Sequence, residues 1–254
     1  MIPKKIHFVW LGPNKKSELS ENCIQSWRQH CPDWDIREWG NADVAKIRSR
    51  YLEQAIYCGR WAFASDYMRL YALASEGGFY LDTDLELTSS LEDLTQLNFV
   101  IGFERYANTL GIGTALIGAS PSDNLICRLL SHYDGLDFLR SGLMDLTPNT
   151  RRFEAFFAEH FKITLIDDST FFLGDGSIIF PSGYFCARNE GVKNYAIHHF
   201  LGSWGHNFVR TRCWQMGRLR FAKFRVNQFQ KNHLLKRFPM KLSFFNSSIN
   251  HARF

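Results

Sequence analysis

The chain has 254 residues and a mass of 29.6 kDa, enough for one large domain with a substantial core. Apolar residues make up 45% and charged residues 22%, which excludes disordered, collagen-like and low-complexity proteins. No apolar run approaches the roughly 18 residues of a membrane-spanning helix, so a cytoplasmic protein is expected. The six cysteines form no C-x-x-C pair, and we expect reduced thiols and no closed zinc site.

The net charge of +5 conceals an asymmetry along the chain. Residues 209–254 hold eleven Lys and Arg and no acidic residue, so residues 1–208 carry 19 basic against 25 acidic side chains, a net charge of −6. This predicts a main domain over 1–208 and a basic, aromatic-rich, mainly helical extension over 209–254. A basic segment beside an acidic body is typical of contact with an anionic partner, either a membrane surface or nucleic acid.

In chain order, the patterns of apolar residues predict a strand over 5–10, a helix over 17–30, a strand over 34–39 and helices over 41–49 and 60–76, the last ended by Gly77 and Gly78. A strand over 79–81 follows. Later strands are predicted over 98–103, 113–118, 163–166, 177–180 and 195–199, and helices over 122–132 and 150–160. Strands alternating with helices predict an α/β sheet, in which ligands gather at the carboxyl ends of the strands.

Two carboxylates follow the predicted strand over 79–81. Asp82 and Asp84 are two residues apart, and on extended backbone they would share a face and need a compensating cation. The alternative is an ordinary polar turn. Two known metal patterns fail: the phosphatase-type D-x-D-x-T/V would need Thr or Val where the chain has Glu86, and a calcium-binding loop would need Gly where it has Leu87.

The preceding helix carries an acid and a base on one face. Ala62, Asp66, Arg69 and Leu73 are spaced by four, three and four residues, which aligns them along the helix. An ordinary exposed ion pair is the simpler interpretation. However, only Gly77 and Gly78 separate this helix from the strand before Asp82, so the pair is expected near the carboxylates. There Arg69 could hold a phosphate and Asp66 could accept hydrogen bonds from sugar hydroxyls.

Near the end of the main domain, His198 and His199 are adjacent on a predicted strand. Neighbouring strand residues point to opposite faces, so only one of them can face a given site. The alternative is that both are loop or core histidines.

Together these motifs resemble a known family. Ala62, Ser65, Asp66 and Arg69 form A-x-x-S-D-x-x-R, and Gly77, Gly78, Tyr80, Asp82 and Asp84 form G-G-x-Y-x-D-x-D. This resembles the sugar-binding region of D-x-D glycosyltransferases, which include bacterial capsule and O-antigen transferases, yeast initiating α-1,6-mannosyltransferases and glucosylating domains of clostridial toxins. Residues 6–12 resemble their first strand, and residues 199–204 their carboxyl-terminal metal motif. The resemblance implies a GT-A type fold, a Rossmann-like mixed sheet flanked by helices.

The resemblance also implies roles for single residues. Val9 and Trp10 would contact the uracil, and Tyr80 would lie by the nucleotide. Ser65 belongs to the motif in which Asp66 and Arg69 bind the donor sugar. Ser203 and Trp204 would close over the diphosphate.

In the implied metal site, Asp82 would be shared between ribose and metal, and Asp84 and His199 would be direct ligands. Two carboxylates and one imidazole suit Mn²⁺, with Mg²⁺ as a second choice. Glu104 and Asp175 are candidates for touching the acceptor, with surface positions as the alternative.

The sequence thus predicts a metal-dependent, retaining transferase that moves a hexose (galactose, glucose or an N-acetyl derivative) from a UDP-sugar to a saccharide or lipid-linked oligosaccharide acceptor in bacterial surface polysaccharide synthesis. The basic extension predicts a peripheral location on the inner face of the plasma membrane. The alternative is a non-catalytic protein that binds a membrane or nucleic acid through this extension, although the acidic body makes nucleic acid the less favoured partner.

Overall fold

The computed structural model describes residues 1–106, 109–163, 167–187, 193–201, 209–216 and 219–225, with side chains up to residue 201 apart from that of Tyr106. The chain divides into two compact units. The first contains Met1–Arg140 and Asp145–Ser203, and the second contains Ser141–Met144 and Trp204–Phe254. All described candidate site residues belong to the first unit.

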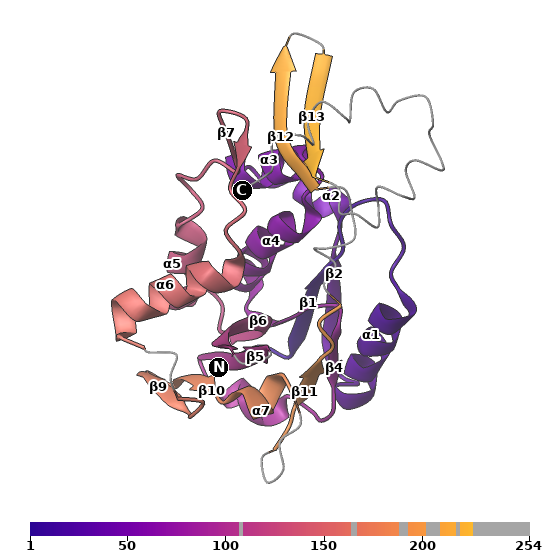
Figure 1. The fold of residues 1–254 in the computed structure, drawn as a ribbon. Coiled ribbons are helices and arrows are strands. Elements are labelled where there is room, and N and C mark those ends of the chain that lie inside the picture. The colour runs from indigo at the N-terminus through magenta and orange to yellow at the C-terminus, as the bar shows by residue number, and fades with distance from the viewer. Residues whose placement is uncertain (107–108, 164–166, 188–192, 202–208, 217–218, 226–254) are drawn as a thin grey trace. The chain divides into compact units, whose positions relative to one another are not determined.

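A mixed seven-stranded sheet forms the centre of the first unit, with the strand order β2-β1-β3-β6-β5-β10-β9 (Figure 1). β1 pairs in parallel with β2 and β3, and β5 with β10, whereas β6 runs antiparallel to both β3 and β5. The predicted α/β class with a mixed sheet flanked by helices is confirmed. The strands are β1 Lys5–Val9, β2 Asp35–Trp39, β3 Gly78–Leu81, β5 Phe99–Tyr106, β6 Thr109–Ala119, β9 Phe171–Gly174 and β10 Ser177–Phe180.

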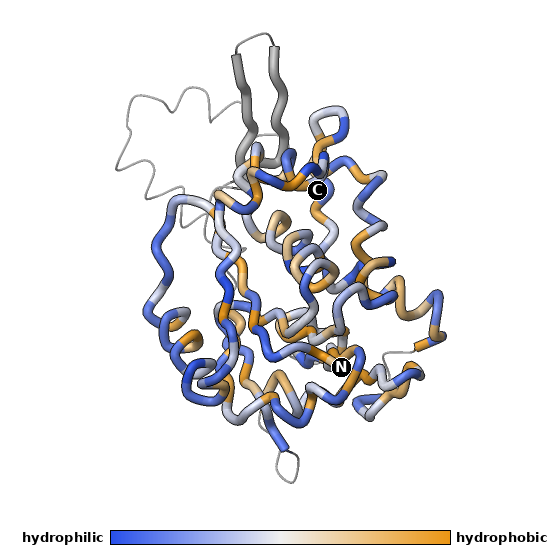
Figure 2. The backbone as a smooth tube through the Cα atoms, turned by 180° about the vertical axis from the view of Figure 1, so that it is seen from behind, coloured by the Kyte–Doolittle hydropathy of each residue, from blue (hydrophilic) through white to orange (hydrophobic). Residues whose placement is uncertain are grey.

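Helices cover both faces of this sheet (Figure 1). On one face, α4 packs on β1, β3 and β6, and α6 packs on β6. On the other face, α1 and α7 cover the cluster that includes Ile6, Phe8 and Phe79. Hydrophobic and hydrophilic residues alternate along the outer helices, as amphipathic packing requires (Figure 2). The helices are α1 Glu18–His30, α2 Asn41–Val44, α3 Arg50–Tyr57, α4 Trp61–Glu76, α5 Asn124–Ser131, α6 Asn149–Phe161 and α7 Ser182–Phe185, with a 3₁₀ turn over Glu92–Gln96.

The connection from α4 to β3 is fixed by two glycines and a buried histidine. Gly77 and Gly78 have φ of 64° and 100°, and a Cβ on Gly78 would lie 2.6 Å from the Lys5 carbonyl oxygen. His7 Nε2 donates to the Gly77 carbonyl at 2.7 Å, because the indole N–H of Trp39 donates to His7 Nδ1 at 3.1 Å. The turn that brings α4 beside the end of β3 is therefore held from the neighbouring strand.

A second, two-stranded sheet lies next to the end of β3. β4 (Leu85–Leu87) pairs with β11 (Ala196–His198), so the two histidines come back to the Asp82–Asp84 segment although more than 100 residues separate them in the chain. The indole N–H of Trp27 in α1 donates to the Leu85 carbonyl at 2.7 Å and ties this small sheet to the core.

The extension departs from the prediction. It was expected to be mainly helical, but β12 (Val209–Met216) and β13 (Leu219–Arg225) form an antiparallel hairpin in the second unit, where β12 also pairs with β8 (Leu143–Met144). Val, Thr, Trp and Phe, which prefer strands, recur in these two segments of the sequence. The correction applies to 209–216 and 219–225, because the rest of the extension lies outside the described residues.

Smaller departures occur in the first unit. The helix expected over 41–49 ends at Val44, and a separate helix, α3, follows it with Ser49 accepting from the Leu52 amide as N-cap. The strand expected over 163–166 lies almost wholly outside the described residues. The described helices include none that is long and apolar enough to cross a membrane.

Candidate active site

Asp66 and Arg69 form a buried ion pair in α4, not the exposed pair of the simpler interpretation. Arg69 Nη2 donates to Asp66 Oδ1 at 2.8 Å, and Arg69 Nη1 donates to the Thr114 carbonyl of β6 at 2.7 Å. The two side chains are 2% and 4% exposed. Burial raises the pKa of Asp66 to about 7, opposed by the Arg69 charge, while the surrounding acids hold the pKa of Arg69 above its usual range despite burial. Arg69 is therefore a fixed positive charge.

The same arginine reaches the end of β3. Arg69 Nη2 lies 3.3 Å from Asp82 Oδ1, and the Tyr80 hydroxyl donates to that oxygen at 2.7 Å. The Arg69 guanidinium also stacks 4.6 Å from the Tyr80 ring centroid, and Ser65 Oγ lies 3.3 Å from the Tyr80 hydroxyl. Five predicted site residues thus form one connected network: Ser65, Asp66, Arg69, Tyr80 and Asp82.

Two atoms of this network are buried without a hydrogen bond to any described residue, namely Asp66 Oδ2 and Arg69 Nε. Leaving a buried polar atom unpaired costs about 1–3 kcal/mol. Buried polar atoms of this kind are commonly satisfied by an ordered water.

Asp84 lies in a turn after β3, and the turn, not extended backbone, brings it near Asp82. The Leu85 amide donates to the Asp82 carbonyl at 3.0 Å, which closes this turn. Asp84 Oδ2 accepts from the Leu201 amide at 2.9 Å, and Asp84 Oδ1 lies 3.4 Å from His198 Nε2. Burial favours a higher pKa for Asp84, but the His198 hydrogen bond and charge outweigh it and the pKa is lowered.

The structure brings His198 to the carboxylates, where the sequence led us to expect His199. One ligand atom each from Asp82, Asp84 and His198 lie within 4.8 Å of one another, a spacing that a metal ion could bridge. Burial lowers the pKa of His198, but the hydrogen bonds with Asp84 and Glu104 outweigh it and raise the pKa to about 10. His199 Nε2 instead lies 2.8 Å from Glu86 Oε2.

The backbone explains this exchange of the two histidines. β11 ends at His198, and Phe200 adopts φ of 49°, so the strand alternation that would place His199 does not continue. The His199 amide donates to the Asp84 carbonyl at 2.9 Å, which holds its backbone at the site while its side chain meets Glu86.

Val9 and Trp10 lie at the carboxyl end of β1. Because β1 pairs in parallel with β3 with His7 opposite Tyr80, Val9 lies beside the position of Asp82 at the same sheet edge. Trp10 is half-buried, and its indole N–H donates to the Asn14 carbonyl at 2.8 Å. Ser203 and Trp204 lie outside the described residues.

Of the two residues expected to touch the acceptor, Glu104 lies at the site and Asp175 does not. Glu104 in β5 accepts from His198 Nδ1 at 3.0 Å, a contact that no sequence spacing indicated. Asp175 lies in the turn between β9 and β10, where its carbonyl accepts from Asn98. Asn98 precedes β5, whereas Glu104 is near its other end, so Asp175 is remote from the network.

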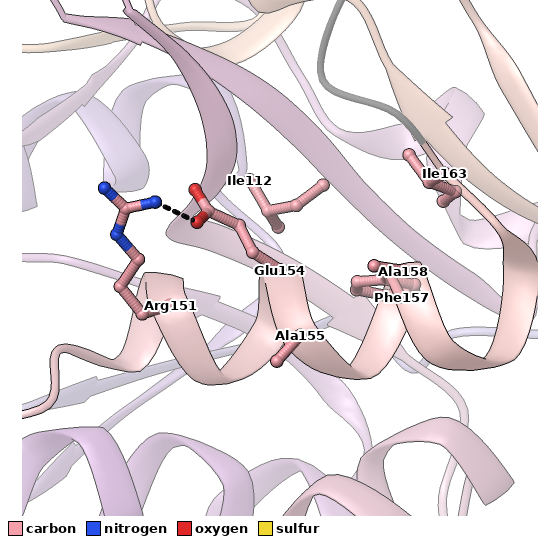
Figure 3. A pocket seen from close by; sticks show the side chains of 7 residues that line it. All are labelled: Ile112, Arg151, Glu154, Ala155, Phe157, Ala158 and Ile163. Atoms are coloured by element: carbon pink, nitrogen blue, oxygen red, sulfur yellow. Dashed lines mark hydrogen bonds and ion pairs between the residues drawn. The ribbon is translucent and has the colours of Figure 1, made fainter.

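A separate pocket lies beside α6 (Figure 3). Its lining is mostly apolar, and the one ion pair drawn joins Arg151 to Glu154 at 2.9 Å. The lining residues include none of the predicted site residues: Ile112, Arg151, Glu154, Ala155, Phe157, Ala158 and Ile163.

A known protein-family model matches the part of the chain that contains this network. Residues 17–100 match the family model described as "Glycosyltransferase sugar-binding region containing DXD motif". This confirms, over that stretch, the resemblance to D-x-D glycosyltransferases. No curated protein sequence matches the chain.

Solved glycosyltransferase structures show limited likeness. PaToxG glycosyltransferase is 20% identical, with a TM-score of 0.48 over 63% of this chain and 70% of that chain. GlyE of Streptococcus pneumoniae is 11% identical, with a TM-score of 0.37 over 63% and 44%. LgtC, described as a galactosyltransferase in complex with donor and acceptor sugar analogues, is 14% identical, with a TM-score of 0.32 over 51% and 63%. These values carry no information about substrate.

Proposed function

We propose that this chain, which carries the DXD sugar-binding region of glycosyltransferases, transfers a hexose from a UDP-sugar to a saccharide acceptor with the help of a divalent metal ion. The observation that carries the proposal is the convergence of Asp82, Asp84 and His198 beside the buried Asp66–Arg69 pair. Carboxylates and an imidazole form a site for a cation, and the guanidinium next to them forms a site for a phosphate.

The donor atoms fit the proposed metal. Two carboxylate oxygens and one imidazole nitrogen suit Mn²⁺, and Mg²⁺ is the alternative, whereas a closed tetrahedral zinc site would need more Cys or His. When bound, such an ion stabilises the negative charge that develops on a departing diphosphate. Asp82 also contacts Arg69, so this carboxylate would link the metal side of the site to the guanidinium.

Arg69 is the residue best prepared to hold the diphosphate. Its guanidinium is already fixed by Asp66 and the Thr114 carbonyl, so it would not need to be ordered when the substrate binds. The roles of Asp66 and Arg69 toward the hydroxyls of the donor sugar rest on the sequence resemblance. The roles expected from the resemblance are proposed for the remaining residues: uracil contact by Val9 and Trp10, nucleotide contact by Tyr80, and closure over the diphosphate by Ser203 and Trp204.

The finer parts of the proposal rest on the sequence resemblance. These are retention of the anomeric configuration, galactose, glucose or an N-acetyl derivative as the transferred sugar, and a role in bacterial surface polysaccharide synthesis. The basic extension supports a place at the inner face of the plasma membrane, where a lipid-linked oligosaccharide acceptor would lie at an anionic surface.

A panel of UDP-sugars tests this function without knowledge of the acceptor. Each donor is incubated with the protein and Mn²⁺, and slow hydrolysis to UDP and free sugar is measured. We expect one donor to be hydrolysed above background, and Asp84→Asn and omission of the metal to abolish the hydrolysis. Equal UDP release by wild type and Asp84→Asn with every donor would contradict the proposal.

A further inference from the structure

The carboxylate of Glu104 contacts His198, the histidine of the proposed metal site, at the ring nitrogen that is turned away from Asp84. His198 Nδ1 donates to Glu104 Oε2 at 3.0 Å, while His198 Nε2 lies 3.4 Å from Asp84 Oδ1 on the other side of the ring. Both partners are largely buried, at 12% exposure for His198 and 19% for Glu104. The ring is thus held at both nitrogens, and only one of them faces the carboxylate pair.

The pairing of β5 with β6 leaves space for the Glu104 side chain. The register of β5 and β6 shifts between Ile101 and Gly102, and beyond the shift Gly113 pairs with Gly102 and lies diagonally beside Glu104. A Cβ on Gly113 would lie 2.9 Å from the Glu104 Cβ and 3.3 Å from its Oε2. A glycine at this position therefore gives the Glu104 side chain the room to reach His198.

Glu104 has no other charged partner among the described residues, since its only ion pair there is with His198. Its neighbour Arg105 pairs with Asp168 instead. A buried carboxylate without Lys or Arg is costly unless a hydrogen bond to a specific group offsets the burial.

We propose that Glu104 is a positioning residue, which fixes the ring of His198 so that Nε2 is held toward Asp82 and Asp84. Carboxylates that accept from the second nitrogen of a metal-binding histidine orient the ring in this way, and losing them weakens metal binding about 10- to 100-fold. The inference deepens the proposed function and rests on it for the metal.

The chain offers a matched control in the neighbouring pair. Glu86 and His199 form the same type of contact at 2.8 Å, but Glu86 is 43% exposed and neither residue is in the convergent group. Binding of Mn²⁺ alone is measured from the electron paramagnetic resonance signal of the free ion, for wild type, Glu104→Ala, Glu104→Gln and Glu86→Ala. Urea unfolding of each variant checks that it is folded.

We expect Glu104→Ala to raise the Kd for Mn²⁺ by about tenfold or more. Glu104→Gln keeps an oxygen acceptor and should recover part of this loss, and Glu86→Ala should bind as wild type does. An unchanged Kd for Glu104→Ala, or an equal loss in Glu86→Ala, would overturn the proposal.

A second measurement does not depend on the metal. In the metal-free protein, the Nδ1–H proton of His198 should give a slowly exchanging nuclear magnetic resonance signal that is absent in His198→Asn. It should persist in Glu86→Ala and disappear in Glu104→Ala. Persistence in Glu104→Ala would overturn the positioning role, whereas failure of wild type to bind Mn²⁺ with this signal present would count against the metal alone.

Discussion

Replacement of Arg69 by Met tests whether the Asp66–Arg69 pair is a buried, mutually dependent unit. The substitution removes the hydrogen bonds to Asp66 and to the Thr114 carbonyl and leaves Asp66 buried without its cation. Breaking a buried pair from one side costs about 3–5 kcal/mol. For a chain of this size, 1 kcal/mol corresponds to roughly 2–4 °C, so Tm should fall by about 6–20 °C.

The pH dependence of this loss follows from Asp66. Burial raises its pKa, and removal of Arg69 raises it further, so the folded variant holds a proton that the unfolded chain has released. A raised carboxyl pKa means that stability is lost as pH rises through the folded value. The deficit of Arg69→Met should therefore be larger at pH 8 than at pH 6.

The assays are thermal and urea unfolding followed by circular dichroism, with Arg151→Met as the control. Arg151 and Glu154 are also three residues apart on a helix and 2.9 Å apart, but Arg151 is 69% exposed, so its loss should cost less than about 1 kcal/mol. The double variant Asp66→Asn with Arg69→Met should be less destabilised than the sum of the single variants. Equal losses for Arg69→Met and Arg151→Met would refute the reasoning.

Three further predictions concern other parts of the chain. His198→Ala should lower donor hydrolysis at least tenfold, about 1.4 kcal/mol on the barrier, and His199→Ala should lower it less; the reverse order would restore the sequence-based assignment. Burial lowers the pKa of His7, so below about pH 6.5 the unfolded chain takes up a proton that the folded chain does not. The free energy of unfolding should fall as pH decreases through this range, more steeply in wild type than in His7→Asn, and identical slopes in urea titrations would contradict it. The extension should bind anionic liposomes at low salt, since even four of its eleven basic residues would contribute roughly 4 kcal/mol; equal sedimentation with neutral and anionic vesicles would contradict this.

The proximity of Asp66, Arg69 and Asp82 was predictable because it depends on residues that are close in the sequence. The spacing of Asp66 and Arg69 follows from helix geometry, and the Gly77–Gly78 turn places α4 next to Asp82. Their burial was not predictable from spacing, because it depends on Thr114, which β6 brings in from 45 residues away.

The histidine exchange shows where strand alternation stops being informative. The alternation rule correctly separated the two side chains, but which one faces the carboxylates depends on the end of β11 and on the left-handed backbone of Phe200. The contact between Glu104 and His198 spans 94 residues and needs the register shift of β5 and β6, for which the sequence carries no spacing signal.

The extension shows a different limit. Its basic residues interleave with aromatic ones, and we interpreted the spacing as helical. Over residues 209–212 and 219–221, strand-forming and basic residues alternate with a period of two, and such short runs do not distinguish a strand from a helix by periodicity alone. The pairing of Met216 with Leu219 across two residues favours the hairpin.

The most direct measurement of the central claim is the thermal shift produced by UDP and Mn²⁺ together. If the metal joins the Asp82–Asp84 carboxylates to the diphosphate, each ligand completes the site of the other, and both together should raise Tm far more than either alone. At about 100 times Kd the pair would add roughly 2.7 kcal/mol of stability. Asp84→Asn should lose most of this gain, measured against its own ligand-free Tm. Equal shifts in Asp84→Asn and wild type, or a combined shift no larger than the sum of the separate ones, would contradict the account.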